Sequence, residues 1–533
     1  MRLFIRVFPG LCCFLFLTKG KILDVTYVSW LLDGDPAMSW IGWQFFRTSD
    51  LFQIPWGLNP YYGLEISSSI VYSDSIPLFS ILFKLFNSLL PTQFQFFGIW
   101  ILLCFLLQSY FASKLLGLFV SSSRLRFLFT FFFCLAPCFL WRLHGHYSLC
   151  AHWVILAGLY GYFNRKFSFS YWLILVFLSS LIHPYICFFC LSFFCIDLLQ
   201  RALQRQLSFY KVILLFCLCV SILGAGMYSA GYFSLGSDLS SDTSGYRMNL
   251  LSVFDAEEGW SRIFPDIPGE RFEYEGFNFI GTGILILIVF CFLSFRKGTS
   301  LFLKPKMIPL GFFLLFLFFY SLSEKINFAD KTIFVYQYPV ILEPFHSVFR
   351  ANGRFFWPVL YTIYLVVMIQ FYKSISKKWI ELVTFVILII FVFDLYPKIE
   401  FFQKRFDVPT ANQKQLVAAS PEWTKISKPY RSMYLVFPEN KPKHWETLAL
   451  VALENRLSIN FGYFTRLNRV RLLESKNKLA KEIEQGNFSD KILYVFSDKR
   501  IWSEAVSRKA EVDLTGEIDG IYFLAPKFLL HEI

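Results

Sequence analysis

This sequence has few charged residues for its length, compared with soluble globular proteins. Only 17% of the 533 residues are charged, whereas 56% are hydrophobic. This balance, with a mean hydropathy of +0.50, excludes an ordinary soluble globular protein. Apolar runs of about 16 to 25 residues, each long enough or nearly long enough to cross a bilayer, recur as far as Tyr396 and then stop. We therefore expect an α-helical polytopic membrane protein.

Cysteine is missing from the long loops and from the tail. The twelve Cys all fall within or beside apolar runs, so no disulfide framework is indicated. The net charge of +13 does not point to nucleic acid, because Lys and Arg cluster in the short loops between apolar runs. Membrane orientation explains that distribution, and we expect no nucleic-acid partner.

The apolar runs predict about eleven transmembrane helices. They lie at residues 3–18, 94–119, 127–141, 149–163, 171–182, 185–199, 212–233, 277–295, 307–322, 355–372 and 380–396. A further apolar segment, 76–90, carries Lys84 in its middle and is flanked by Pro77 and Pro91, so we expect a helix lying in the interface.

With that choice the basic loops share one side, which the positive-inside rule makes cytoplasmic, and nearly all acidic residues of the membrane half face outward. The prediction is a transmembrane domain at 1–396 with outer loops 19–93, 234–276 and 323–354. Residues 397–533 follow on the outer, periplasmic side of a bacterial inner membrane. Strand patterns at 431–437 and 491–496, with a helical pattern at 467–485, indicate a small α/β domain there.

Two carboxylates stand one residue apart, at Asp33 and Asp35, directly after the first apolar run. The aromatic residues of 38–46 then fit an amphipathic helix on the membrane surface. A carboxylate at this place can deprotonate an acceptor hydroxyl, or hold a divalent cation (Mg²⁺, Mn²⁺ or Ca²⁺) against a phosphate. The local alternative is helix capping and first-turn charge.

Several longer strings resemble a known class. GDPAMSWIGWQFFR, WGLNPYYGLEISSSIVYSDSIPLF, HPY, YEGFNFIGTG and FRANGRFFWP look like an uncharacterised bacterial family usually grouped with the GT-C membrane glycosyltransferases. The resemblance covers most of the membrane half. It implies a sugar donor carried on a polyprenyl phosphate, with Asp35 first and Asp33 second as the base or metal-associated group, although several characterised members have an adjacent acidic pair instead. It also implies direct displacement at the anomeric carbon with inversion.

A phosphate leaving group needs positive charge, best supplied by Arg. Arg350 and Arg354 stand at the outer mouth of a late span, where interfacial snorkelling is the alternative role. Arg142, His144 and His183 are further candidates to reach the donor head group. A metal site at His144 and His146 lacks a placed third ligand.

The first outer loop also carries polar residues that either shape an acceptor cleft or only fold the loop: Asn59, Tyr61, Glu65 and Asp74. Glu273 and Glu275 read as a second carboxylate cluster or, more simply, as a solvated loop face. The apolar runs predict a membrane-lipid environment, and the resemblance implies a polyprenyl-phosphate-linked sugar and an unidentified envelope glycan, lipid or protein acceptor.

Two other classes compete with an enzyme. A transporter of envelope precursors would place ionisable residues near the bilayer midplane, whereas the centres of these spans are nearly free of charge. A noncatalytic membrane scaffold, whose outer domain binds a partner, needs no acidic motif and stays open. We expect a membrane glycosyltransferase.

Overall fold

The computed structural model describes residues 2–236, 246–270, 273–293, 307–409 and 420–531. Parts of the predicted loop 234–276, the end of the predicted span 277–295 and the basic loop after it lie outside the described residues. The chain divides into two compact units. A helical unit comprises Met1–Asp24, Phe96–Gly224 and Ser241–Asp407, and a mixed unit comprises Val25–Gln95, Ala225–Ser240 and Val408–Ile533. Most of the predicted first outer loop, 19–93, therefore belongs to the same unit as the C-terminal residues.

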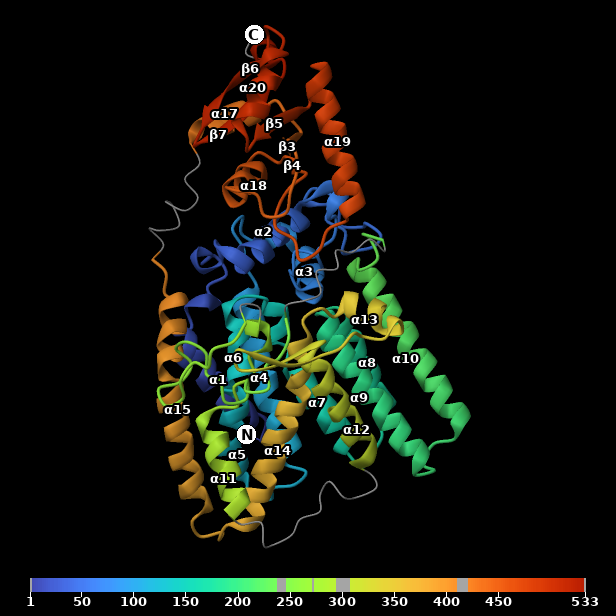
Figure 1. Ribbon diagram of the computed structural model, residues 1–533, viewed down its shortest axis with the longest axis vertical. Helices are drawn as coiled ribbons and strands as arrows, with labels where there is room; N and C mark the ends of the chain where they lie inside the picture. Colours follow the sequence, from blue (N-terminus) through green and yellow to red (C-terminus); the bar gives the residue numbers. More distant parts are fainter. Residues whose placement is uncertain (1, 237–245, 271–272, 294–306, 410–419, 532–533) are drawn as a thin grey trace. The chain divides into compact units, whose positions relative to one another are not determined.

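The helical unit is built almost entirely from helices (Figure 1). They are α1 (Arg2–Thr18), α4 (Phe97–Leu116), α5 (Ser123–Cys134), α6 (Pro137–Leu140), α7 (Trp153–Phe163), α8 (Phe169–Ser180), α9 (Pro184–Leu203), α10 (Phe209–Ala230, whose last residues belong to the mixed unit), α11 (Thr282–Leu293), α12 (Ile308–Leu322), α13 (Glu343–Val348), α14 (Trp357–Ser374) and α15 (Ile380–Arg405). An antiparallel hairpin, β1 (Lys325–Phe328) and β2 (Lys331–Val335), follows α12. The sequence patterns did not predict this hairpin.

Helix α4 lies at the centre of the packing. It contacts α1, α5 and α7, and α7 in turn packs against α9. On another side α11 contacts both α14 and α15. Close approach of α4 to the chain after α1 requires glycine, because a Cβ at Gly98 would collide with the backbone oxygen of Ile22.

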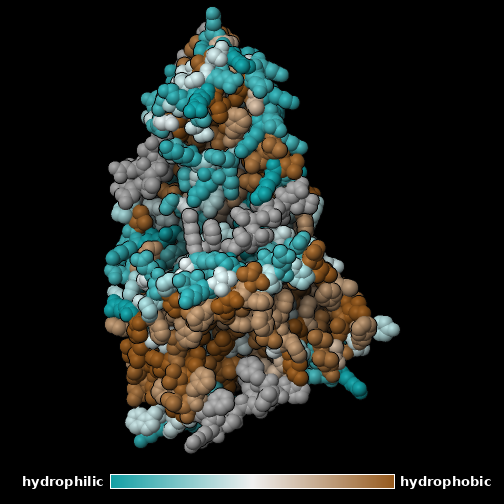
Figure 2. Space-filling view, viewed as in Figure 1, coloured by the Kyte–Doolittle hydropathy of each residue, from teal (hydrophilic) through white to brown (hydrophobic). Residues whose placement is uncertain are grey.

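Among the described residues, five helices are long and apolar enough to cross a membrane: Phe97–Leu116, Pro184–Leu203, Phe209–Ala230, Asn352–Ser374 and Ile380–Arg405. A bent pair, Ser123–Cys134 with Pro137–His144, makes up to six. Apolar residues gather over the helical unit in Figure 2. Helix α10 leaves large apolar side chains such as Leu214 and Phe216 exposed, as a helix facing lipid would. The chain thus has the features of a multi-pass helical membrane protein.

Proline explains where several helices begin and break. The predicted span 127–141 is divided by a 46° bend, since Pro137 lacks an N–H and starts α6 as a new first turn. Pro184 starts α9 in the same way, after α8 has ended at Ser180. Helix α15, by contrast, continues through Pro397 to Arg405, past the point where the apolar pattern stops.

The mixed unit contains a five-stranded sheet in the order β4-β3-β5-β7-β6. β3 pairs in parallel with β4 and β5, whereas β7 pairs antiparallel with β5 and β6. The elements are α2 (Gly34–Thr48), α3 (Pro77–Lys84), α17 (Pro421–Ser427), β3 (Ser432–Leu435), α18 (Trp445–Glu454), β4 (Ser458–Ile459), α19 (Arg469–Gln485), β5 (Ile492–Phe496), α20 (Lys499–Ser507), β6 (Leu514–Ile518), β7 (Ile521–Ala525) and α21 (Phe528–His531). The two predicted strands and the predicted long helix are confirmed as β3, β5 and α19.

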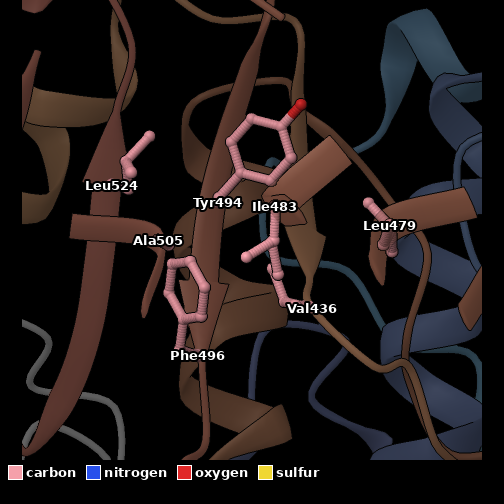
Figure 3. Packing of buried hydrophobic residues seen from close by; sticks show 7 residues of the cluster. All are labelled: Val436, Leu479, Ile483, Tyr494, Phe496, Ala505 and Leu524. Carbon is pink, nitrogen blue, oxygen red and sulfur yellow. The ribbon is translucent and has the colours of Figure 1, made fainter. Parts of the chain in front are cut away.

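A small apolar core holds this sheet to its helices (Figure 3). Leu479 and Ile483 lie four residues apart on one face of α19 and belong to the same buried cluster as Tyr494 and Phe496 of β5. Ala505 of α20 and Leu524 of β7 belong to it as well. The polar remainder of α19 faces solvent, as its charged sequence requires.

Candidate functional site

The acidic motif stands at the start of α2. Asp33 occupies the N-cap position in extended conformation, yet its side chain makes no capping hydrogen bond. Gly34 follows with φ +62°, a left-handed conformation that glycine tolerates best, and Asp35 lies in the first helical turn. Asp33 is exposed and Asp35 is half-buried. The capping role weighed for Asp33 is therefore not realised by its carboxylate.

Asp35 is joined to the C-terminal residues of its own unit by a tyrosine. The Tyr463 hydroxyl donates to Asp35 Oδ1 at 2.8 Å. Tyr463 is itself fixed, because its backbone N–H donates to the Tyr62 hydroxyl at 3.1 Å and its ring lies under Lys441 Nζ at 4.6 Å. Sequence patterns missed Tyr463, which is more than 400 residues from Asp35 in the chain. Only the contact between the start of α2 and the segment after β4 reveals it.

A second carboxylate lies near Asp33. Burial raises the pKa of Glu446, in the first turn of α18, and the charge of Asp33 raises it further. Within the described ranges, however, no three His, Cys, Asp or Glu side chains come close enough together to hold a metal ion. The residues present at Asp33 and Asp35 do not make a complete metal site, so we derive no step through a metal.

The helix after the motif differs from the expectation of an amphipathic surface helix. Its residues from Pro36 to Arg47 are all buried. The indoles of Trp40 and Trp43 and the amide of Gln44 all donate to the backbone oxygen of Phe94. These hydrogen bonds fix the side chains inside the unit. The fixed side chains in turn hold the start of α2 in place.

The other residues expected in this loop have unequal surroundings. Asn59 is buried and donates to the backbone oxygen of Gly42 at 2.9 Å, which braces the loop against α2. Asp74 is buried with φ +52°, whereas Glu65 and Tyr61 are exposed. The Tyr61 backbone oxygen accepts from Ile459 N of β4, so this segment extends the sheet. Asn59 folds the loop, and Tyr61 and Glu65 remain on the surface.

The predicted arginines meet in the helical unit around one carboxylate. Arg142 Nη1 and Arg354 Nε lie 3.0 Å and 2.9 Å from the same oxygen of Glu275. All three side chains are at least 90% buried. Burial by itself raises the pKa of Glu275, but the charges of Arg142 and Arg354 outweigh it and hold that pKa well below its ordinary value. The expectation that Glu275 lies on a solvated loop face is wrong, because it is the counterion of two buried guanidiniums.

Three of the motif strings converge at this cluster. Asn278 donates to the backbone oxygens of Gly276 and Gly353, which joins YEGFN to RANGR. A Cβ on Gly353 would collide with the Gly276 backbone, so both strings need glycine here. Tyr185 of the HPY string lies under the Arg354 guanidinium at 4.9 Å. Its hydroxyl also accepts from the Ala351 N–H at 2.7 Å.

The remaining candidates, His183, Arg350 and His144, make the following contacts. His183 caps α9, its Nδ1 accepting from the Tyr185 N–H at 3.3 Å. Arg350 lies with its guanidinium 5.9 Å from the Tyr246 ring. His144 is packed among the rings of Trp141, Trp260, Phe401 and Phe402. That aromatic surrounding suits packing better than head-group binding.

The cluster carries one net positive charge, from two guanidiniums and one carboxylate. The Nε of Arg142 has no hydrogen-bond partner among the described residues, although it is buried. An unpaired buried donor on a cation is a place where an anion can be bound. The Trp357 ring, 5.4 Å from the Arg142 guanidinium, shields that charge from water on one side.

A separate polar cavity of about 380 Å³ lies in the same unit. Its lining includes Asp255, Glu257, Glu258 and Asp266, beside Glu270 and Glu273, which pair with Arg247. Burial, and then the charges of Asp255 and Asp266, raise the pKa of Glu257 to about 8. This carboxyl is therefore largely protonated at neutral pH.

Comparison with known proteins gives a family for both parts of the chain. Residues 7–396 match a family model described as a domain of unknown function, DUF6311. Residues 422–526 match the model described as the DUF6311 C-terminal domain. No curated protein matches the chain.

Proposed function

We propose that this chain, which belongs to the DUF6311 family, is a membrane glycosyltransferase of the GT-C kind. In this proposal it transfers a sugar from a polyprenyl-phosphate donor to an envelope glycan, lipid or protein. The observation that carries it is the Asp35 carboxylate, half-buried at the start of α2 and oriented by Tyr463. A base must be positioned by a second group and stay accessible to its substrate, and Asp35 meets both conditions.

The chemistry we propose is a single displacement. Asp35 takes the proton from an acceptor hydroxyl, whose oxygen attacks the anomeric carbon of the donor sugar. The bond between that carbon and the phosphate oxygen breaks, and the lipid phosphate leaves with the electron pair. One carboxylate suffices, and the sugar inverts its configuration.

The helical unit, taken by itself, offers a candidate anion site in the cluster of Arg142, Arg354 and Glu275. Its net charge of one and the unpaired Nε of Arg142 suit a phosphate oxygen. Glu275 fixes both guanidiniums, so little reorganisation is needed when a phosphate binds there. Snorkelling no longer describes Arg354, because its side chain is turned to a buried carboxylate instead of to water.

We further propose about eleven transmembrane helices in a bacterial inner membrane, with the C-terminal domain in the periplasm. Short helices such as Phe169–Ser180 and Ile308–Leu322 support the higher number, since they are apolar throughout. A reporter fused after Asp407 tests the orientation. A periplasmic signal is expected, and a cytoplasmic signal would invert the proposed topology.

The activity is tested with purified full-length chain in lipid nanodiscs and defined polyprenyl-phosphate sugars. Asp35→Asn keeps the size of the side chain and removes the base, so transfer should fall by a factor of about 100 or more. Asp33→Asn is the matched control one residue away, and it should retain most activity. Folding of both variants is checked by thermal unfolding.

Full activity in the Asp35→Asn variant would contradict the assignment of the base. Equal loss in both variants would place the function in the doublet as a whole. Absence of transfer from every defined donor by the wild-type chain, with intact folding, would instead favour a noncatalytic scaffold.

A further inference from the structure

A second cavity, of about 300 Å³, lies in the helical unit among α4, α7 and α8. Its walls are largely aromatic, and two lysines stand at its edge. The lining residues are Tyr110, Phe111, Lys114, Tyr160, Gly161, Asn164, Lys166, Ser168, Tyr171 and Trp172. None of these residues belongs to the proposed active site.

Both lysines of the cavity lack a counterion. Lys114 stands in the last turn of α4 with its Nζ 5.0 Å from the Tyr160 ring, and Lys166 is exposed in the loop before α8. No carboxylate pairs with either one among the residues that the structure describes. Two uncompensated ammonium groups at one cavity attract an anion.

The cavity is held in shape by a buried ion pair. Asp197 of α9 accepts from Arg201 Nε at 2.8 Å and from the Trp172 indole at 3.0 Å. Arg201 also donates to the backbone oxygen of Asn164 at 3.0 Å. Trp172 and Asn164, two of the lining residues, are thus fixed by contacts made outside the cavity. A preformed wall lowers the cost of ordering when a ligand binds.

The start of α8 adds further positive potential. Ser168 caps this twelve-residue helix, accepting from the Tyr171 N–H at 3.3 Å, and Ser168 and Tyr171 both line the cavity. The N-terminus of a helix carries partial positive charge that favours anions. The C-terminal ends of α4 and α7, which also border the cavity, offset this helix contribution, so the positive charge at the aromatic walls comes from the two lysines.

We propose that this cavity binds the phosphate head group of an anionic membrane phospholipid, with Lys114 and Lys166 at the phosphate. The aromatic walls then contact the glycerol and the upper acyl chain of the lipid. A soluble anion would leave these aromatic walls uncovered. Lys114 stands in the last turn of α4, one of the helices long and apolar enough to cross a membrane, so it lies at the depth of a head group. Basic pockets between transmembrane helices are suited to anionic lipids. This inference does not depend on the proposed transferase activity.

The test is native mass spectrometry of the delipidated full-length chain in detergent. Phosphatidylglycerol and phosphatidylcholine with the same acyl chains are titrated separately. We expect phosphatidylglycerol to bind at least about tenfold more tightly than phosphatidylcholine. Lys114→Gln and Lys166→Gln should each weaken phosphatidylglycerol binding about fivefold, and the double variant about 25-fold, with phosphatidylcholine binding unchanged.

Lys211→Gln, at an exposed lysine in the first turn of α10 that does not line the cavity, is the control and should bind like wild type. Lys114→Arg with Lys166→Arg should retain binding, because the charge is kept. The proposal is overturned if the double Gln variant binds phosphatidylglycerol like wild type, or if Lys211→Gln weakens binding equally. It is also overturned if glycerol 3-phosphate competes as well as the whole lipid, since the cavity would then bind free phosphate.

Discussion

Replacement of Glu275 by Gln tests the arginine cluster most directly. In the folded chain Glu275 is the counterion of both Arg142 and Arg354, and the three side chains are 7%, 2% and 10% exposed. Gln keeps the shape but removes the carboxylate charge that both buried guanidiniums share. Removing one partner of a buried ion pair costs about 3–5 kcal/mol, so the free energy of unfolding should fall by that amount.

The arrangement also predicts an order among the single variants. Arg142→Met leaves Glu275 paired with Arg354, so its loss of stability should be smaller than that of Glu275→Gln. The triple variant Arg142→Met, Glu275→Leu and Arg354→Met removes all three charges together. It should recover most of the lost stability. Unfolding is measured in detergent with increasing SDS, followed by tryptophan fluorescence.

The pH dependence gives an independent check. The folded-state pKa of Glu275 is lowered from 4.5, so the carboxylate stabilises the fold fully above that pH and loses its contribution as pH falls toward the lowered pKa. The difference in stability between wild type and Glu275→Gln should be constant from pH 8 to about pH 5 and shrink below about 4.5.

A loss under about 1 kcal/mol for Glu275→Gln, or a larger loss for Arg142→Met, would refute the shared-counterion argument.

Three further outcomes are expected. Tyr463→Phe should keep the fold, because the ring contacts remain, but reduce transfer about tenfold if the hydroxyl orients Asp35; unchanged transfer would make the contact structural only. Gly98→Ala should lower the free energy of unfolding by about 1–3 kcal/mol in SDS titration, because the new Cβ meets the Ile22 backbone, and wild-type stability would contradict that contact. Glu257→Gln should gain stability relative to wild type as pH rises from about 4.5 to about 8 in thermal melts and keep a constant advantage above 8, because over that range deprotonation of Glu257 opposes folding; a pH-independent difference would argue against the raised pKa.

The regular elements were the most predictable from sequence, because their signals are local. Apolar runs located most of the helices, strand patterns located β3 and β5, and apolar residues at helical spacing located α19. Proline marked the turn before α9, and the bend at Pro137 follows the same local rule although the sequence patterns read 127–141 as one span. The continuation of α15 through Pro397 departs from that rule.

The candidate site was predicted only in part. The arginines were named, but their shared partner Glu275 was assigned to a loop surface, since nothing near it in sequence shows that it is buried. Tyr463 was not named at all. Short polar residues in loops have no periodicity, so sequence pattern gives neither their burial nor their partners.

Sequence alone determined that this chain has too little charge for an ordinary soluble protein, that its long runs are apolar and that an acidic doublet follows the first of them. Only the tertiary structure decided that most of the segment between the first two long apolar runs joins the C-terminal sheet in one unit, and that two distant arginines share one carboxylate. The physical reason is range: hydropathy and helical periodicity are properties of neighbouring residues. Counterions and hydrogen-bond partners are chosen by distance in space, across gaps of up to hundreds of residues.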